Sequence, residues 1–233
     1  MKALYKKELD YYLNSPVGYI IVVLFAVFAN FFYIKDIFVV GSGSLQPFFS
    51  VLPWFFLAFI PAISMRIFAE EKRLNTVETL LTLPLSEISI IIAKYLALLT
   101  VFLIGLALTL ALPLSLGVVA HLYLPEVFAG YIGVFLLGSA FIAVAMFFSS
   151  LTKNQVVAFL GSVCTLFILL VLSSDFLGTV LPKAAQDALT FFGPLYHLQN
   201  FVKGVVDIRS LIYFLSLSLL FLFLTAVVIE KRD

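Results

Sequence analysis

A dense charged cluster holds the residue types that could do chemistry in this 233-residue chain. It lies in the segment RIFAEEKRLNTVETLLTLPLSE, between two apolar runs, and its polar members include Glu70, Glu71, Lys72, Arg73, Asn75, Thr76 and Glu78. Acidic and basic side chains interspersed over so few positions can recognise and orient a charged protein surface. The same residues could instead form an ordinary charged loop whose basic members only fix the orientation of the chain in a membrane.

The second half of this segment has the pattern of a short helix. Asn75 followed three residues later by Glu78 is a capping-box arrangement, which predicts that a helix begins there. Leu80 and Leu81 then contribute to an apolar patch at helical spacing, and Pro84 ends the run. A helix of about two turns is not stable alone in water. We therefore expect it to dock against a partner.

Motifs for catalysis are absent from the sequence. There is no G-x-x-x-x-G-K-[ST], no H-E-x-x-H and no G-x-S-x-G. His121 and His197 lie far from any acidic cluster, and the single cysteine, Cys164, lies inside an apolar run. We expect neither a catalytic residue nor a metal site, and His197 is expected to pack or hydrogen-bond rather than to bind a ligand. The net charge of +1 argues against a nucleic-acid partner.

The elements that must position the cluster are apolar enough to cross a bilayer. The chain is 63% hydrophobic and only 12% charged, which is too little polar surface for a soluble domain. Runs of about 20 apolar residues predict an all-α membrane protein formed as one domain over 1–233. Its six expected spans are 17–34, 48–68, 87–114, 127–151, 156–174 and 211–229. Small residues in the fourth span predict close helix packing.

The basic residues predict the orientation of the spans. With six spans both termini share one side, and that side collects Lys2, Lys6, Lys7, Arg66, Lys72, Arg73, Lys94, Lys153, Lys231 and Arg232. The other side has only Lys35, Lys183, Lys203 and Arg209. Basic loops stay in the cytoplasm, so we expect both termini there and the chain in the plasma (inner) membrane.

Two segments outside the expected spans, and one lysine near the start of a span, also allow predictions. Residues 1–16 are amphipathic and predict a helix in the cytoplasmic interface, with a solvated tail as the alternative. Lys94, near the start of the third span, is expected to reach back to the interface. Residues 178–210 predict a helix over 182–191, a break at Gly193-Pro194 and a second helix over 195–203. That apolar region should lie at the outer interface or dip into the protein, unless it is a loose loop.

The charged segment also carries a family resemblance. EEKRLNTVETLLTLPLS resembles the signature that links the second and third spans of ABC-2 type transporter permeases. KKELDYYLNSPVGYI and FFGPLYHLQNFVKGVVDIRSLIYFL resemble flanking parts of the family, closest to single-domain permeases of the gliding-motility and nitrous-oxide-reductase-maturation type. Asn75 stands where the family usually has glycine, and asparagine tolerates a left-handed backbone.

The resemblance implies a fold, a role and partners. The fold would be an ABC-2 (type V exporter-like) transmembrane domain, and residues 69–86 would be the coupling region that docks on a separate ATPase. The coupling residues implied are Glu70, Glu71, Lys72, Arg73, Asn75, Thr76, Glu78, Leu80 and Leu81. Residues of an outer gate would be Phe191, Phe192, Pro194 and His197.

The implied assembly is the permease half of an exporter. It would contain a second permease copy or paralogue and membrane lipid, with ATP and Mg on the ATPase and no cofactor on this chain. The alternative is a non-transporting membrane scaffold that only anchors a cytoplasmic partner.

Overall fold

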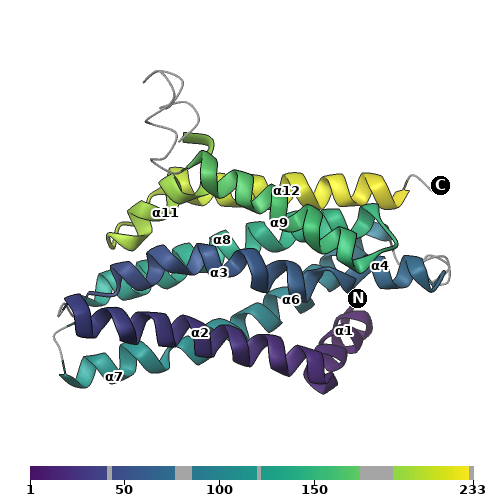
Figure 1. Cartoon of the computed structure of the whole chain (residues 1–233). Coiled ribbons are helices and arrows are strands. Elements are labelled where there is room, and N and C mark those ends of the chain that lie inside the picture. Colours follow the sequence, from purple (N-terminus) through teal and green to yellow (C-terminus); the bar gives the residue numbers. More distant parts are fainter. Residues whose placement is uncertain (41–43, 77–85, 120–121, 174–190, 231–233) are drawn as a thin grey trace.

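The chain folds into an elongated bundle of helices (Figure 1). The computed structural model describes residues 1–40, 44–76, 86–119, 122–173 and 191–230, and within these ranges every regular element is a helix. The helices are α1 (Lys2–Asn14), α2 (Pro16–Val40), α3 (Gln46–Ser64), α4 (Arg66–Arg73), α6 (Glu87–Thr109), α7 (Ala111–Val119), α8 (Leu124–Leu151), α9 (Gln155–Leu172), α11 (Pro194–Val202) and α12 (Ile208–Glu230).

The predicted membrane spans coincide with helices. In the described ranges, five helical stretches are long and apolar enough to cross a membrane: 46–73, 87–117, 124–151, 155–172 and 208–230. A sixth span is possible if α1 and the 18–34 part of α2 count as one pair, bent by 68°. The prediction of an all-helical membrane protein is therefore confirmed. The third span is interrupted after Thr109, where α6 passes into α7.

Helix α8 forms the centre of the bundle. It packs against α3, α9, α11 and α12, and its middle turns are almost completely buried. Small residues make this packing possible, because a Cβ atom at Gly130, Gly133 or Gly138 would collide with the rings of Phe49, Phe201 and Phe102, respectively. The close packing predicted for the fourth span is confirmed.

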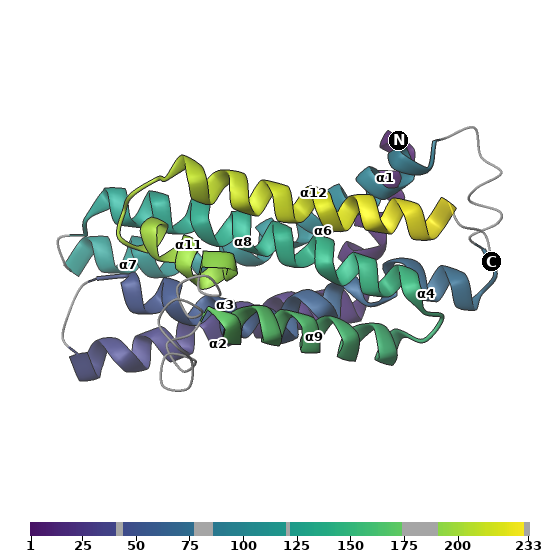
Figure 2. The same ribbon diagram turned by 90° about the horizontal axis from the view of Figure 1, so that it is seen from above.

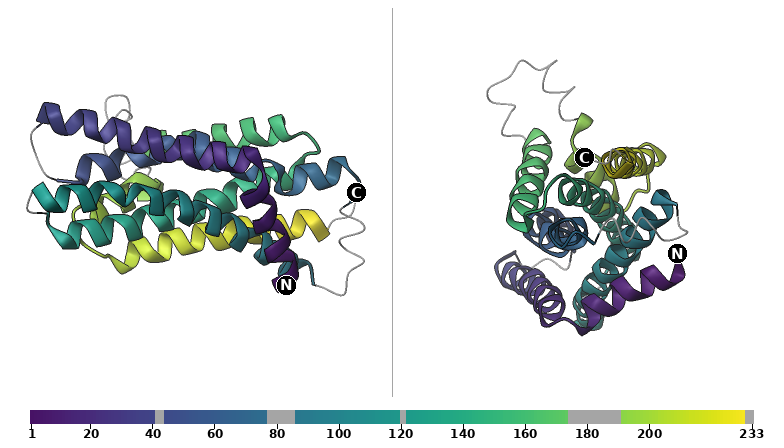
Figure 3. Two further views of the ribbon diagram at one scale, coloured as in Figure 1. Left: turned by 90° about the horizontal axis from the view of Figure 1, so that it is seen from below. Right: turned by 90° about the vertical axis from the view of Figure 1, so that its right-hand side faces the viewer.

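The N-terminal helix α1 runs across one end of the bundle, as both views of Figure 3 show. It breaks from α2 at Ser15, whose backbone is extended, and Pro16 occupies the first turn of α2, where a missing N–H costs little. Gly18 permits the sharp bend, because any side chain there would collide with the Tyr12 carbonyl. We call this end, which also holds α4, the α4 end, and the opposite end, which holds α11, the α11 end.

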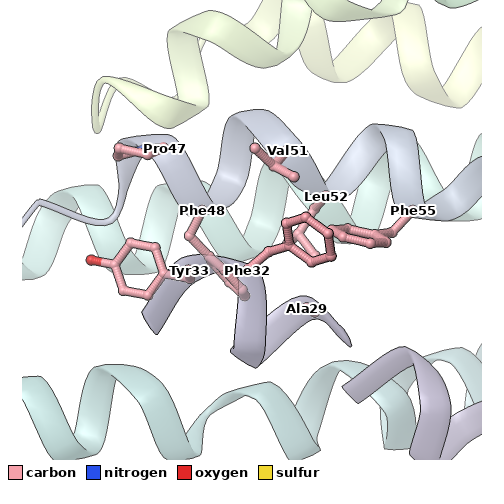
Figure 4. Close-up of a pocket in the computed structure, with 8 residues that line it drawn as sticks. All are labelled: Ala29, Phe32, Tyr33, Pro47, Phe48, Val51, Leu52 and Phe55. Atoms are coloured by element: carbon pink, nitrogen blue, oxygen red, sulfur yellow. The ribbon is translucent and has the colours of Figure 1, made fainter. Parts of the chain in front are cut away.

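A shallow apolar pocket lies between α2 and α3 (Figure 4). Its lining residues are Ala29, Phe32, Tyr33, Pro47, Phe48, Val51, Leu52 and Phe55. The Tyr33 hydroxyl donates to the Ser44 carbonyl at 2.7 Å, which satisfies its polar tip. The pocket therefore offers apolar contacts and no charged group.

Candidate functional site

The charged residues Glu70 to Arg73 belong to a helix that continues the second span. Proline at position 61 removes one backbone donor inside α3, and the helix breaks four residues later at Met65 before resuming as α4. Figure 2 shows α4 at the end of the bundle, beyond α3. These residues were expected in a loop between spans, so the helix extends further than the sequence predicted.

A serine of the central helix holds this break together. The Ser149 hydroxyl of α8 accepts hydrogen bonds from the backbone N–H groups of Phe68 (3.1 Å) and Ala69 (3.2 Å). It also donates to the carbonyl of Met65 at 2.8 Å. Backbone groups left unpaired by a helix break are costly in an apolar environment. Ser149 satisfies three of them and so anchors α4 to α8.

A buried lysine joins α4 to two other helices. Lys94 of α6 has a side chain only 1% exposed, and its ammonium donates to Oε1 of Glu8 in α1 and Oε1 of Glu71 in α4, both at 2.8 Å. Its third hydrogen bond goes to the carbonyl of Ile67 at 3.1 Å. The ammonium is thus enclosed by protein, and its expected position at the membrane interface stays a prediction. Carboxylates from α1 and α4 and the Ile67 carbonyl meet the ammonium inside the protein and together satisfy all three of its donors.

Two further contacts tie α1 to this region. The guanidinium carbon of Arg66 lies 3.6 Å from the ring centre of Tyr11, within cation–π range, and Arg66 also pairs with Glu70 at 3.3 Å. The Tyr12 hydroxyl donates to the carbonyl of Ile63 at 2.6 Å. Charged and polar side chains therefore join α1 to the α3–α4 break.

Helix α4 ends in a left-handed turn at Asn75. The φ angle of Asn75 is 54°, and Asn75 N–H and Thr76 N–H donate to the carbonyls of Lys72 (3.4 Å) and Glu71 (3.0 Å). This pattern is a Schellman motif. The left-handed backbone expected of Asn75 is confirmed. Its expected role as an N-cap is not supported, because N-cap residues are ordinarily extended.

The predicted coupling residues divide into two groups. Glu71 faces inward to Lys94, whereas Arg73, Asn75 and Thr76 are exposed and Lys72 is half-buried. Glu70 is partly exposed and pairs with Arg66 and, at 4.0 Å, with Arg73. The predicted residues Glu78, Leu80 and Leu81, and with them the short helix, lie outside the described residues. Beyond them, the Ser86 hydroxyl accepts from Ser89 N–H at the start of α6.

At the α11 end, His197 is buried among aromatic rings. Its ring stacks on Tyr213 with centroids 4.1 Å apart, Nε2 donates to the Phe191 carbonyl at 2.9 Å, and Nδ1 lies 3.3 Å from the Ser210 hydroxyl. Burial lowers the pKa of His197 below its usual 6.5, against the opposing effects of the Phe191 carbonyl and of Asp207. Burial therefore favours the neutral imidazole, whose Nδ1 can accept from the Ser210 hydroxyl. The prediction that His197 packs and hydrogen-bonds is confirmed.

The start of α11 depends on a close approach to α9. The Ser173 hydroxyl accepts from Leu195 N–H at 3.1 Å, and Pro194 occupies the first turn of α11. A side chain at Gly193 would collide with Ser173. The predicted break at Gly193-Pro194 and the helix after it are confirmed. Phe191 and Phe192 are exposed, and the helix expected over 182–191 falls almost wholly outside the described residues.

At the α11 end, the carboxylate of Glu126 joins two helices, a role that the sequence analysis did not predict. Glu126, in the first turn of α8, accepts from the backbone N–H of Leu45 at 2.8 Å and the hydroxyl of Ser44 at 3.0 Å. It also accepts from the side-chain amide of Gln46 at 3.4 Å. These groups form the N-terminus of α3, where the helix dipole favours a negative charge. Glu126 thus fixes α8 to α3.

The described residues form a helical membrane protein with a braced, charged end. Among the described residues, no group of His, Cys, Asp and Glu side chains could hold a metal ion. A family model described as "ABC-2 family transporter protein" matches residues 2–229, and none of the curated proteins compared with the chain matches it. The chain belongs to the ABC-2 transporter family, and it is the membrane permease component of an ABC transporter.

Proposed function

We propose that this chain is the permease subunit of an ATP-binding cassette exporter and that residues 69–86 couple it to separate ATPase subunits. The observation that carries the proposal is the construction of α4. This helix projects Lys72 and Arg73 from the end of the bundle, and its inner face is anchored to α6 and α8 through Lys94 and Ser149. A surface that must both bind a partner and transmit its motion needs these two properties.

The α4 end is the cytoplasmic end in this proposal. The excess of basic residues there favours that orientation, with both termini inside and six spans in the inner membrane. Two copies of the chain, or this chain and a paralogue, would enclose the transport pathway within the lipid. ATP and Mg would bind to the ATPase subunits and not to this chain.

Mechanistically, closure of the ATPases would push on residues 69–86. Since α4 is bound to α8 and α6, a displacement of α4 would also move these two helices. The displacement would not be lost in the bending of a loop. At the far end, the aromatic cluster around His197 would form part of an outer gate with Phe191, Phe192 and Pro194. Nucleotide would shift the permease between two states according to its affinity for each.

The test is reconstitution with the native partner. The chain is purified from its own membrane, the co-purifying ATPase is identified, and ATP hydrolysis is measured in liposomes with and without the chain. We expect stimulated hydrolysis, reduced to the level of the ATPase alone by Leu81→Asp and strongly reduced by Glu78→Ala. Glu230→Ala, at the exposed end of α12, is the matched control.

Two outcomes would contradict the proposal. Full stimulation in Leu81→Asp would remove the coupling role of residues 69–86. A partner that binds but shows no change in hydrolysis would favour the scaffold instead. Exporter direction is measured separately, by ATP-dependent uptake of a lipophilic dye into vesicles, because added ATP reaches only complexes whose cytoplasmic side faces outward.

A further inference from the structure

The only fully buried cation in the described ranges is Lys94, and its partners are far away in sequence. Glu8 precedes Lys94 by 86 residues and Glu71 precedes it by 23 residues. The three charges come from three helices, α1, α6 and α4. Side chains only 12% and 17% exposed at Glu8 and Glu71 place the cluster well away from water.

The cluster is not arranged for stability alone. It contains two carboxylates and one ammonium, and Oε2 of Glu71 is buried without a hydrogen-bond partner among the described atoms. Buried ion pairs contribute little net stability compared with apolar side chains of similar volume, but removal of one partner is very costly. Such a cluster therefore specifies which helices stay together more than it lowers the free energy of the fold.

The connection between α1 and α4 depends on such side chains. The backbone of α1 packs chiefly against α6 and, less extensively, against α2. It reaches the α3–α4 segment through the Glu8–Lys94–Glu71 bridge, the Arg66–Tyr11 contact and the Tyr12 hydroxyl. Of these, the bridge alone joins all three helices with charged groups.

We propose that Lys94 is a positioning residue that locks α1 to α4 through Glu8 and Glu71, so that the N-terminal helix moves with the coupling segment when the ATPase pushes on it. This inference rests on the proposed function. Because α1 leads directly into α2 through the bend at Gly18, the lock gives the push on α4 a second route into the membrane, by way of the first span.

Neutral substitution separates this role from stability. The triple variant Glu8→Gln, Glu71→Gln and Lys94→Met removes every charge of the cluster together, so no unpaired charge is left buried. We expect it to fold with an unchanged melting temperature and to bind the ATPase. Its stimulation of ATP hydrolysis should fall by a factor on the order of ten, the size of a typical coupling between sites.

A distance measurement supplies the second readout. Spin labels replace the exposed residues Lys6 in α1 and Leu74 at the end of α4, in a chain whose Cys164 is changed to serine. With the original charges, the label-to-label distance should be the same with and without ATP and vanadate. In the neutral triple variant it should change when nucleotide is added.

A failure of the lock can be distinguished from a failure of the proposed function. A native chain that neither binds nor stimulates the ATPase would overturn the proposed function. A native chain that stimulates, together with a folded triple variant that stimulates equally and keeps a constant distance, would overturn the lock.

If the triple variant does not fold, Glu8→Ala alone decides, because it removes the acceptor on α1 while Lys94 keeps Glu71 and the Ile67 carbonyl. Reduced stimulation then supports the lock, and normal stimulation overturns it. Asp10→Ala, on the exposed side of the same helix, is the matched control and should behave as the native chain.

Discussion

The two ends of the bundle are held together by different chemistry. At the α4 end, the ammonium of Lys94 joins α1, α4 and α6 by ion pairs, and Arg66 adds a cation–π contact. At the α11 end, neutral hydrogen bonds and stacked rings around His197 join α11 to α12, and Glu126 binds a helix N-terminus. At the α4 end one ammonium therefore joins three helices at once, whereas at the α11 end separate contacts each join two helices.

The largest loss of stability at either end is expected from a change at Lys94. Lys94→Met alone leaves the carboxylates of Glu8 and Glu71 buried without their ammonium, which should destabilise the fold by about 3–5 kcal/mol. Thermal unfolding of the detergent-solubilised protein measures this loss. Lys6→Met, on the exposed face of α1, is the control. An unchanged melting temperature would mean that the ion pairs do not hold the α4 end.

At the α11 end, the largest loss of stability should come from a change where α11 lies close to α9. Gly193→Ala places a methyl group against Ser173 and should cost about 1–3 kcal/mol through overpacking. Gly117→Ala is a suitable control, because its nearest neighbour, a methyl carbon of Leu122, would be in ordinary contact at 3.7 Å. Thermal unfolding should show a loss only for the first variant, and equal effects would remove the special role of Gly193.

A change at Ser149 tests whether its hydrogen bonds anchor α4 to α8. Ser149→Ala leaves Phe68 N–H and Ala69 N–H without their acceptor and should cost about 1–3 kcal/mol. Hydrogen exchange should quicken at these two amides and not at α11. Ser216→Ala, whose exposed hydroxyl bonds only to its own helix, should have little effect. Protection that stays the same at both amides would contradict the anchoring role.

Asn75 tests the turn that ends α4. Asn75→Ala should cost about 1 kcal/mol because alanine tolerates a positive φ poorly, whereas Asn75→Gly should be neutral or stabilising. The two variants are compared by thermal unfolding. Equal stability of the alanine and glycine variants would show that the turn relaxes at no cost.

The smallest effect should be a pH dependence at the α11 end. Burial lowers the folded-state pKa of His197 below 6.5, so the unfolded chain binds the proton more readily. Stability should therefore be complete above pH 6.5 and decrease as the pH falls towards the folded-state pKa. The difference in melting temperature between the native chain and His197→Gln, measured from pH 8 to pH 5, isolates this contribution. A difference that does not vary with pH would contradict it.

Local patterns made much of the fold predictable. Long apolar runs gave the spans, Gly193-Pro194 gave the start of α11, and the residue type of Asn75 fitted the turn that ends α4. Each of these depends on residues a few positions apart, so the sequence contains the whole signal. The small residues of α8 predicted its close packing, but neither its central position nor its particular neighbours.

The contacts that brace the candidate site could not be predicted in this way. The partners Glu8 and Lys94, and Ser149 and Phe68, lie more than 80 residues apart and follow no periodic pattern. A lysine inside an apolar run was the one available signal, since such a charge requires a partner. Without the fold, the interface was the simplest place to put it. The coupling role of residues 69–86 remains a prediction.

The central position of α8 also has a consequence for biosynthesis. Helices α2, α3 and α6 leave the ribosome first, but the surfaces of Phe49 and Phe102 that receive Gly130 and Gly138 stay uncovered until α8 has been made. Until then the nascent chain is a set of inserted helices with open grooves, which helical membrane proteins close only in a later association step. A chain that ends before Leu124 would therefore leave the surfaces of Phe49 and Phe102 uncovered.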